Sequence, residues 1–127
     1  VGIEALKDSN VKYADIVIGS RSEYSFEEDM SGYLKKFPRI VLTSGENGAY
    51  QYQASGTLFK PALKVNAIDT TGAGDSFLAG YLAAIAKGDL TGERALNAGV
   101  NWAGLMVTKE QSIPPNWNEV PGYEELL

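Results

Sequence analysis

The sequence contains neither cysteine nor histidine. The absence of cysteine excludes disulfides, thiolate catalysis and cysteine-ligated zinc. The absence of histidine excludes Ser-His-Asp and Cys-His triads and most zinc sites. Acid–base chemistry would therefore fall to a carboxylate, a lysine or a tyrosine. We expect a reducing, cytoplasmic compartment, with which a chain without cysteine is compatible.

Positive charge is also scarce, since 11 Lys and Arg face 16 Asp and Glu for a net charge of −5. No basic stripe is present, so we expect no nucleic-acid partner. No apolar run approaches the roughly 20 residues of a membrane helix, so we expect no membrane partner. The length of 127 residues and the hydrophobic content of 44% are typical of one globular domain. Any anionic ligand must be held by local groups, because the overall field repels it.

The pattern of apolar residues predicts a sheet. Buried strands are expected at 14–19 and 39–43, where short apolar and β-branched runs lie between turn residues. A β-hairpin is expected at 49–53 and 57–60, and the alternation in its first strand is typical of a half-exposed strand.

Two longer helices are expected after the hairpin. The first spans 77–87 and ends at Gly88, and the second spans 95–106 and has Thr91 as its N-cap. The second helix is rich in alanine and glycine, which predicts close packing against its neighbours. Shorter helical stretches are expected at 1–7, where a helix would be ending, within 20–36, with Gly32 as an interruption, and at 124–127. The order of elements favours an α/β sheet with helices on its faces.

Small residues stand where a loop enters the first long helix. Gly72, Ala73 and Gly74 leave backbone N–H groups exposed there, and these donors and the helix dipole make an anion site. Asp75 lies at the same helix start, where its carboxylate would repel a bound phosphate. One reason for its presence is proton abstraction from a hydroxyl that attacks the phosphate. The simpler alternative is that Asp75 is an N-cap and the glycines are ordinary loop residues.

The segment 69–75, with the sequence DTTGAGD, is followed by Ser76, Phe77 and a helix. It resembles the C-terminal signature of the ribokinase-like (PfkB) carbohydrate kinases. The P-loop and dinucleotide fingerprints are both absent. The segment 40–49 resembles the strand and glycine turn that lie beside the nucleotide phosphates in that family.

Two other segments extend the resemblance, and each departs from the family pattern at one position. The strand at 14–18 and Glu23 resemble the strand that leads to the family's Asn-x-x-Glu motif, but Ser20 stands at the Asn position. The segment 98–113 resembles the helix and loop that flank the adenine pocket, but Gln111 stands where many members have glycine.

The resemblance implies a three-layer α/β sheet with helices on both faces. It also implies that residues 1–127 are the C-terminal nucleotide-binding and catalytic part of a kinase whose N-terminal substrate and lid part is absent. The implied reaction is transfer of the γ-phosphate of ATP to a sugar hydroxyl, with Mg²⁺ and, in many members, a monovalent cation such as K⁺. Self-association, or association with the N-terminal half, is expected. A nucleoside kinase of the adenosine type and a non-catalytic nucleotide-binding fragment are the alternatives.

The resemblance also implies residue roles. Asp75 would be the base, and the backbone of Gly72, Ala73 and Gly74 would form an anion hole, which Gly74→Val should crowd while restricting backbone dihedrals that glycine permits. Nucleotide contacts are implied for Thr43, Gly45, Gly48, Asn97, Val100, Asn101 and Gly104. Metal-site roles are implied for Glu23 (the Mg²⁺ water shell) and for Asp69 and Thr71 (the monovalent cation). Each role has a structural alternative. The residues at 43–48 could form an ordinary strand-end turn, and those at 97–104 could belong to a packed helix face. Glu23 could be a solvated helix charge, and Asp69 and Thr71 could brace their loop.

Overall fold

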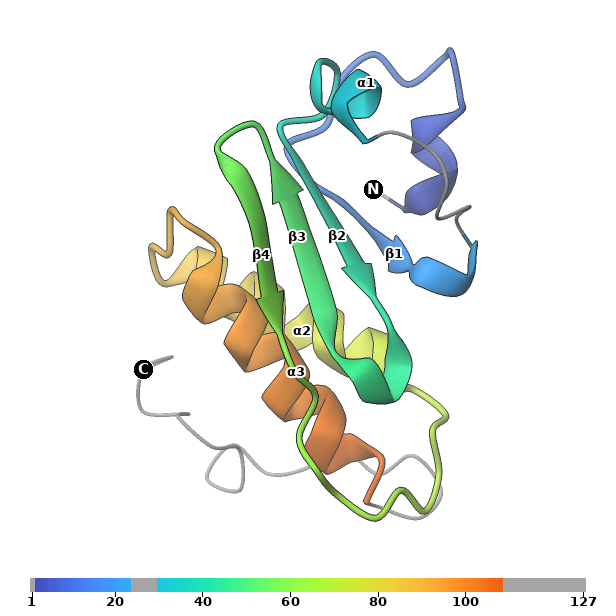
Figure 1. Ribbon diagram of the computed structural model, residues 1–127, viewed down its shortest axis with the longest axis vertical. Helices are drawn as coiled ribbons and strands as arrows, with labels where there is room; N and C mark the ends of the chain where they lie inside the picture. The colour runs from blue at the N-terminus through green and yellow to red at the C-terminus, as the bar shows by residue number, and fades with distance from the viewer. Residues whose placement is uncertain (1, 24–29, 109–127) are drawn as a thin grey trace.

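A computed structural model describes residues 2–23 and 30–108 of the chain. Its centre is a four-stranded mixed sheet of order β1-β2-β3-β4 (Figure 1). Strands β1 (Val17–Ser20) and β2 (Arg39–Thr43) are parallel, and Ser20 pairs with Thr43 at their carboxyl ends. Strands β3 (Ala49–Gln53) and β4 (Gly56–Lys60) follow as antiparallel neighbours. All four predicted strands are therefore confirmed, with shifted bounds for β1 and β4.

Two long helices, α2 (Ala73–Ala86) and α3 (Glu93–Met106), lie together against one face of the sheet (Figure 1). Glycines allow the close approach, since a Cβ on Gly80 of α2 would lie 2.7 Å from the carbonyl oxygen of Ala98 on α3. A Cβ on Gly99 would lie 2.6 Å from the ring of Phe77. The predicted close packing of the alanine- and glycine-rich helix is confirmed.

The start of α3 differs from the prediction that Thr91 is its N-cap. Gly92 occupies the N-cap position, and the carboxylate of Asp89 accepts hydrogen bonds from the backbone N–H groups of Thr91, Gly92 and Ala95 at 3.2, 3.2 and 2.8 Å. Burial pushes the pKa of Asp89 upward, but the hydrogen bonds from Ala95, Thr91 and Gly92 outweigh it and leave the pKa lowered. The hydroxyl of Thr91 accepts from the N–H of Glu93 at 3.2 Å. Thr91 thus contributes to the cap without occupying the N-cap position, and Asp89 accepts most of the capping hydrogen bonds.

Two predictions about the short helices are wrong. Gly2 is extended and pairs in parallel with Ile18, so the 3-10 helix η1 (Ile3–Leu6) begins after an extended residue and does not end a longer helix. Gly32 lies inside α1 (Ser31–Leu34) and does not interrupt it. The helical turn expected at 124–127 lies outside the described residues.

Apolar clusters cover both faces of the sheet. On the α2–α3 side, Val41 packs with Tyr81 and Leu96. On the other side, Ile40 packs with Phe37 and with residues of η1. The predicted α/β architecture is confirmed. No helix among the described residues is both long and apolar enough to cross a membrane.

A buried glutamine joins the sheet to both helices. The side chain of Gln51 on β3 is fully buried, whereas the sequence pattern suggests a half-exposed strand with no special role for this residue. Its amide nitrogen donates to the carbonyl oxygen of Thr91 at 2.9 Å, and its amide oxygen accepts from the hydroxyl of Tyr81. Arg39 also donates to that hydroxyl, at 3.3 Å. These bonds fix α2 and the start of α3 against the strands.

Candidate active site

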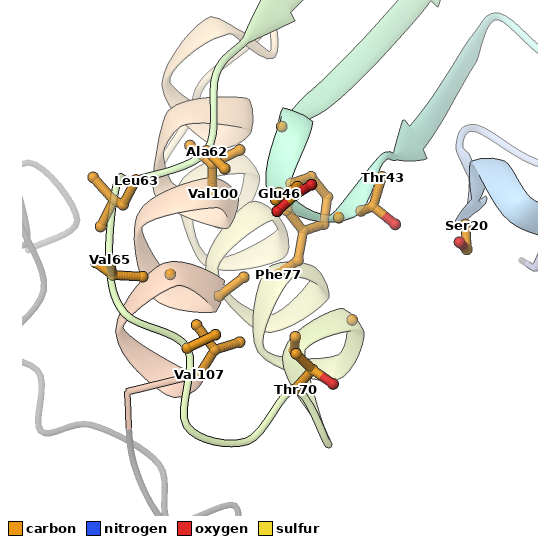
Figure 2. Close-up of a pocket in the computed structure, with 17 residues that line it drawn as sticks. Ser20, Thr43, Glu46, Ala62, Leu63, Val65, Thr70, Phe77, Val100 and Val107 are labelled. Carbon is orange, nitrogen blue, oxygen red and sulfur yellow. The ribbon is translucent and has the colours of Figure 1, made fainter.

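A pocket of about 590 Å³ opens at the carboxyl ends of β1 and β2 (Figure 2). Ligands of open α/β sheets characteristically bind at this edge. Five parts of the chain form its walls: Ser20 at the end of β1, the end of β2 with the turn after it, the segment 62–70, the first turn of α2 with Phe77, and the second half of α3 with Val107. The pocket therefore gathers residues that are far apart in the sequence.

The two ends of the pocket differ in chemistry, as Figure 2 shows. Thr43, at the end of β2, and Thr70, just before α2, lie toward one side. Leu63, Val65 and Val107 line the opposite end, where they offer an apolar surface. A ligand that is charged at one end and flat and apolar at the other matches this division.

The polar end is formed by the N-terminus of α2. Gly72 occupies the N-cap position with a φ of 81°, a left-handed conformation that glycine adopts without steric cost. The backbone N–H of Ala73 donates to the carbonyl oxygen of Thr70 at 3.2 Å. The N–H of Ala73, which we expected in the anion hole, therefore already has a partner. The other N–H groups at the helix start are those of Gly72 and Gly74, from the expected set, and of Asp75. Ala73 and Gly74 both line the pocket, so backbone donors and a helix dipole face its polar end.

In the structure, the position that requires glycine is 72 and not 74. Gly74 lies within the helix without a positive φ, and a Cβ there would meet no atom within 4 Å. The expectation that Gly74→Val restricts dihedrals that only glycine permits is therefore wrong, because the left-handed residue is the one before the helix. The open space beside Gly74 is still consistent with room for a ligand.

Asp75 lies in the first turn of α2 and is exposed to solvent. It is not the N-cap, because Gly72 holds that position. The capping explanation for Asp75 is thereby removed. Asp75 is not among the lining residues, but it follows the two lining residues Ala73 and Gly74 directly in the chain.

The turn between β2 and β3 forms a second wall. It contains the 3-10 helix η3 (Gly45–Asn47), and the N–H of Ser44 donates to the carbonyl oxygen of Gly48 at 2.7 Å. Gly48 has a φ of 117°, and a Cβ on it would overlap the carbonyl oxygen of Lys60. Thr43 donates its hydroxyl to the carbonyl oxygen of Gly19 at 3.4 Å. Three residues that we expect to contact nucleotide line the pocket in this wall, namely Thr43, Gly45 and Gly48.

The resemblance implies nucleotide contacts for four residues of α3, of which two line the pocket and two do not. Val100 and Gly104 line the pocket. Asn97 is exposed and Asn101 is buried, and neither is among the lining residues. A Cβ on Gly104 would lie 2.8 Å from the Cβ of Leu63, so this glycine allows the segment after β4 to lie close over the helix.

Two of the three expected metal-site residues, Asp69 and Thr71, lie in the described part of the chain with their side chains. Asp69 accepts a hydrogen bond from the backbone N–H of Thr71 at 2.9 Å, and this bond lowers the pKa of Asp69. This contact is the loop bracing that the sequence left open as an alternative. The backbone of Glu23 ends the 3-10 helix η2 (Arg21–Glu23), but its side chain lies outside the described part. Within residues 2–23 and 30–108, no group of three or more His, Cys, Asp or Glu side chains could hold a metal ion.

Sequence reasoning missed several lining residues. Glu46 lies in the glycine turn but is not one of the motif positions with an implied role. Phe77 and Val107 have the hydrophobic character of ordinary core residues. The segment 62–67 did carry a signal, because apolar Leu63, Val65 and Ala67 alternate with polar residues. This period of two indicates an extended segment with one apolar face. In the structure, that face lines the apolar end of the pocket.

Comparison with known proteins agrees with this geometry. A family profile described as "pfkB family carbohydrate kinase" matches residues 4–119. A 5-dehydro-2-deoxygluconokinase of Shouchella clausii is 33% identical over 126 residues, which cover 88% of this chain and 38% of that protein. The chain thus spans less than two fifths of the length of this relative.

Solved structures share the fold. A nucleoside kinase of Methanocaldococcus jannaschii, described as an archaeal member of the ribokinase family, has a TM-score of 0.76 and 27% identity, and the match covers 89% of this chain and 40% of that one. A fructokinase double mutant of Vibrio cholerae O395, in fructose, ADP and potassium ion bound form, has a TM-score of 0.68 and 23% identity over 90% of this chain and 41% of that one.

Proposed function

The chain belongs to the PfkB family of carbohydrate kinases, and from that premise we propose that it forms the C-terminal nucleotide-binding and catalytic part of a kinase. The proposed reaction transfers the γ-phosphate of ATP to the hydroxyl of a sugar. The N-terminal part of the kinase would supply most contacts to the sugar.

One observation carries the proposal. A single pocket joins the glycine turn after β2, an apolar surface on α3 and the open N-terminus of α2. The apolar end fits a nucleotide base, and the helix N-terminus fits its phosphates. Asp75 follows the proposed phosphate-binding residues in the same helix turn. Its carboxylate would repel the phosphate in a site that only bound it, whereas a phosphoryl-transfer site can use a carboxylate as a base.

The residues of this chain have distinct tasks in the reaction. Asp75 accepts the proton from the attacking hydroxyl, which raises the nucleophilicity of that oxygen as it approaches phosphorus. The N–H groups of Gly74 and Asp75 donate toward the phosphoryl oxygens, on which negative charge must be balanced during transfer. Because these dipoles are fixed by the helix, they need no reorganisation when the reaction occurs.

Mg²⁺ and K⁺ are proposed as the accompanying ions. Mg²⁺ neutralises phosphate charge and is usually held by one or two carboxylates, water and the phosphates themselves, so the small number of carboxylates in the described pocket fits it. Glu23 is the proposed contact to its water shell. Asp69 and Thr71 are the proposed K⁺ contacts, and the potassium ion in the fructokinase structure supports such a site.

A nucleoside is the second candidate substrate, because a nucleoside kinase is among the similar structures. A purely binding role is the third, since the chain covers 38% of a full-length relative. Asp75 argues against the third, because a binding module gains nothing from a carboxylate beside its phosphate site.

Substitution of Asp75 by Asn in the complete polypeptide that contains this chain tests the assignment. The amide keeps the size of the side chain but cannot take a proton, so we expect kcat to fall by about 10²–10⁴-fold while the Kd for ATP changes little. Glu93→Gln is the matched control, because it removes a first-turn carboxylate from α3 instead of α2. Turnover by the Asp75→Asn variant at more than half the rate of the unaltered enzyme would refute the role of Asp75 as the base.

A further inference from the structure

Glu46 is a pocket residue to which the family motif gives no role. It lies in η3, between two glycines of the turn after β2, and its side chain is exposed. In Figure 2 its carboxylate lies over the pocket, between Thr43 on one side and Val100 on the other. It therefore stands where the polar and apolar ends of the pocket meet.

An ionised carboxylate can only accept hydrogen bonds, and this limits what it can face. It cannot usefully face a phosphate, which offers no donor at neutral pH and carries the same sign of charge. The phosphate end, moreover, is already supplied with donors by the start of α2. The apolar end, formed by residues such as Leu63 and Val107, suits the faces of a base through contact area.

The part of a nucleotide that joins base to phosphates is the ribose. Its 2′- and 3′-hydroxyls are two adjacent donors, and a carboxylate has two oxygens that can accept from both. We propose that Glu46 binds the ribose hydroxyls of the phosphate donor and thereby selects ribonucleotides over deoxyribonucleotides. This inference rests on the proposed function, since it assumes that the pocket binds a nucleotide.

The position of Glu46 suits such a role. The turn that carries it is braced by the bond from the N–H of Ser44 to the carbonyl oxygen of Gly48 at 2.7 Å and by the bond from the N–H of Asn47 to the carbonyl oxygen of Ser44 at 3.0 Å. The backbone under Glu46 is therefore fixed, and a fixed acceptor loses less entropy on binding than one on a mobile loop.

The test measures dissociation constants by calorimetry on the complete polypeptide that contains this chain. ATP, 2′-deoxy-ATP, 3′-deoxy-ATP and ITP are compared on the unaltered protein and on Glu46→Ala and Glu46→Gln. We expect the unaltered protein to bind ATP about tenfold more tightly than either deoxy analogue, as loss of a hydrogen bond to a charged group predicts. In Glu46→Ala the preference should fall to about one, and Glu46→Gln, which keeps one acceptor oxygen, should lie between.

Glu93→Gln serves as the charge-matched control, because Glu93 pairs with Lys60 at 3.5 Å and does not line the pocket. It should leave the preference unchanged. A preference for ATP over deoxy-ATP that survives Glu46→Ala would overturn the inference. So would a change in the ATP-to-ITP ratio alone, which would place Glu46 against the base. Failure of the unaltered protein to bind any nucleotide would instead overturn the proposed function, and this inference with it.

Discussion

The two glycines of the turn after β2 should respond very differently to substitution by alanine. The backbone of Gly48 has φ 117° and ψ −143°, close to a region that essentially only glycine occupies. Gly45 has a φ of 53°, within the left-handed region that other residues enter at modest cost. Both positions are glycines of the same motif, but only the backbone conformation of Gly48 excludes other residues.

Two terms contribute to the cost at Gly48. The dihedral strain is about 1–3 kcal/mol. The added Cβ would also overlap the carbonyl oxygen of Lys60 and lie 2.8 Å from the Cα of Pro61. Both are backbone atoms at the point where Ala49 pairs with Lys60, so relief requires the hairpin to shift. We expect Gly48→Ala to lower the free energy of unfolding by about 3 kcal/mol or more.

Gly45→Ala should cost only about 1 kcal/mol, because a Cβ there meets no atom within 4 Å. Urea unfolding measures the contrast: with a slope near 2 kcal/mol per M, the midpoint should fall by about 1.5 M for Gly48→Ala and about 0.5 M for Gly45→Ala. Calorimetry with ATP on the folded Gly45→Ala variant then reports on binding apart from folding. A Gly48→Ala variant as stable as the unaltered protein would refute the reasoning.

Two further predictions concern the cap of α3 and the isolated chain. Asp89 has a lowered pKa in the folded state, so its contribution to stability is present above its unfolded pKa of about 3.9 and is lost as the pH falls through the folded value. Asp89→Asn should therefore lower the urea midpoint at pH 7 and make little difference near pH 2, and an equal loss at both pH values would contradict the capping role. The 127-residue chain alone should have no measurable sugar-kinase activity and should self-associate or bind an N-terminal piece, because among the described residues one edge of β1 is paired only at the bridge between Gly2 and Ile18. A monodisperse monomer, found by light scattering, that phosphorylates a sugar or nucleoside at about 1–100 s⁻¹ would contradict this.

Local patterns predicted the elements of the fold well, because each element is marked by its own residues. The strand at 39–43 is a β-branched run with every central side chain buried, and its bounds match. The stop at Gly88 matches because a left-handed residue, here with a φ of 100°, ends the helix as expected. The cap of α3 was predicted only in part, because Thr91 accepts one hydrogen bond from the first turn whereas Asp89, six residues before Ala95, accepts most of them and lies outside the usual N-cap position.

Burial on β3 was harder to predict for a different reason. Hydrophobicity alone favours Tyr50 and Tyr52 as the large buried side chains of AYQYQ, yet both are only half-buried and Gln51 is fully buried beside Ala49. Its burial depends on the hydroxyl of Tyr81 and the carbonyl oxygen of Thr91, which lie 30 and 40 residues away. A buried polar group is stable only with its partners in place, and no local pattern specifies partners so distant.

The candidate site shows the same division between local and distant information. The start of α2, which we propose binds the phosphates, is encoded by consecutive residues, so 72–75 could be proposed from the motif. The apolar end of the pocket has no such contiguous code, because Leu63 and Val107 come from different elements and meet only after folding. Their meeting depends on Gly104, whose missing Cβ leaves room for Leu63, and on the N–H groups of Ile68 and Asp69, which donate to the carbonyl oxygen of Val107 at 2.7 and 3.1 Å. The contacts that shape the apolar end of the pocket thus also position the loop that leads into α2, so a substitution at one end should alter the geometry of the other.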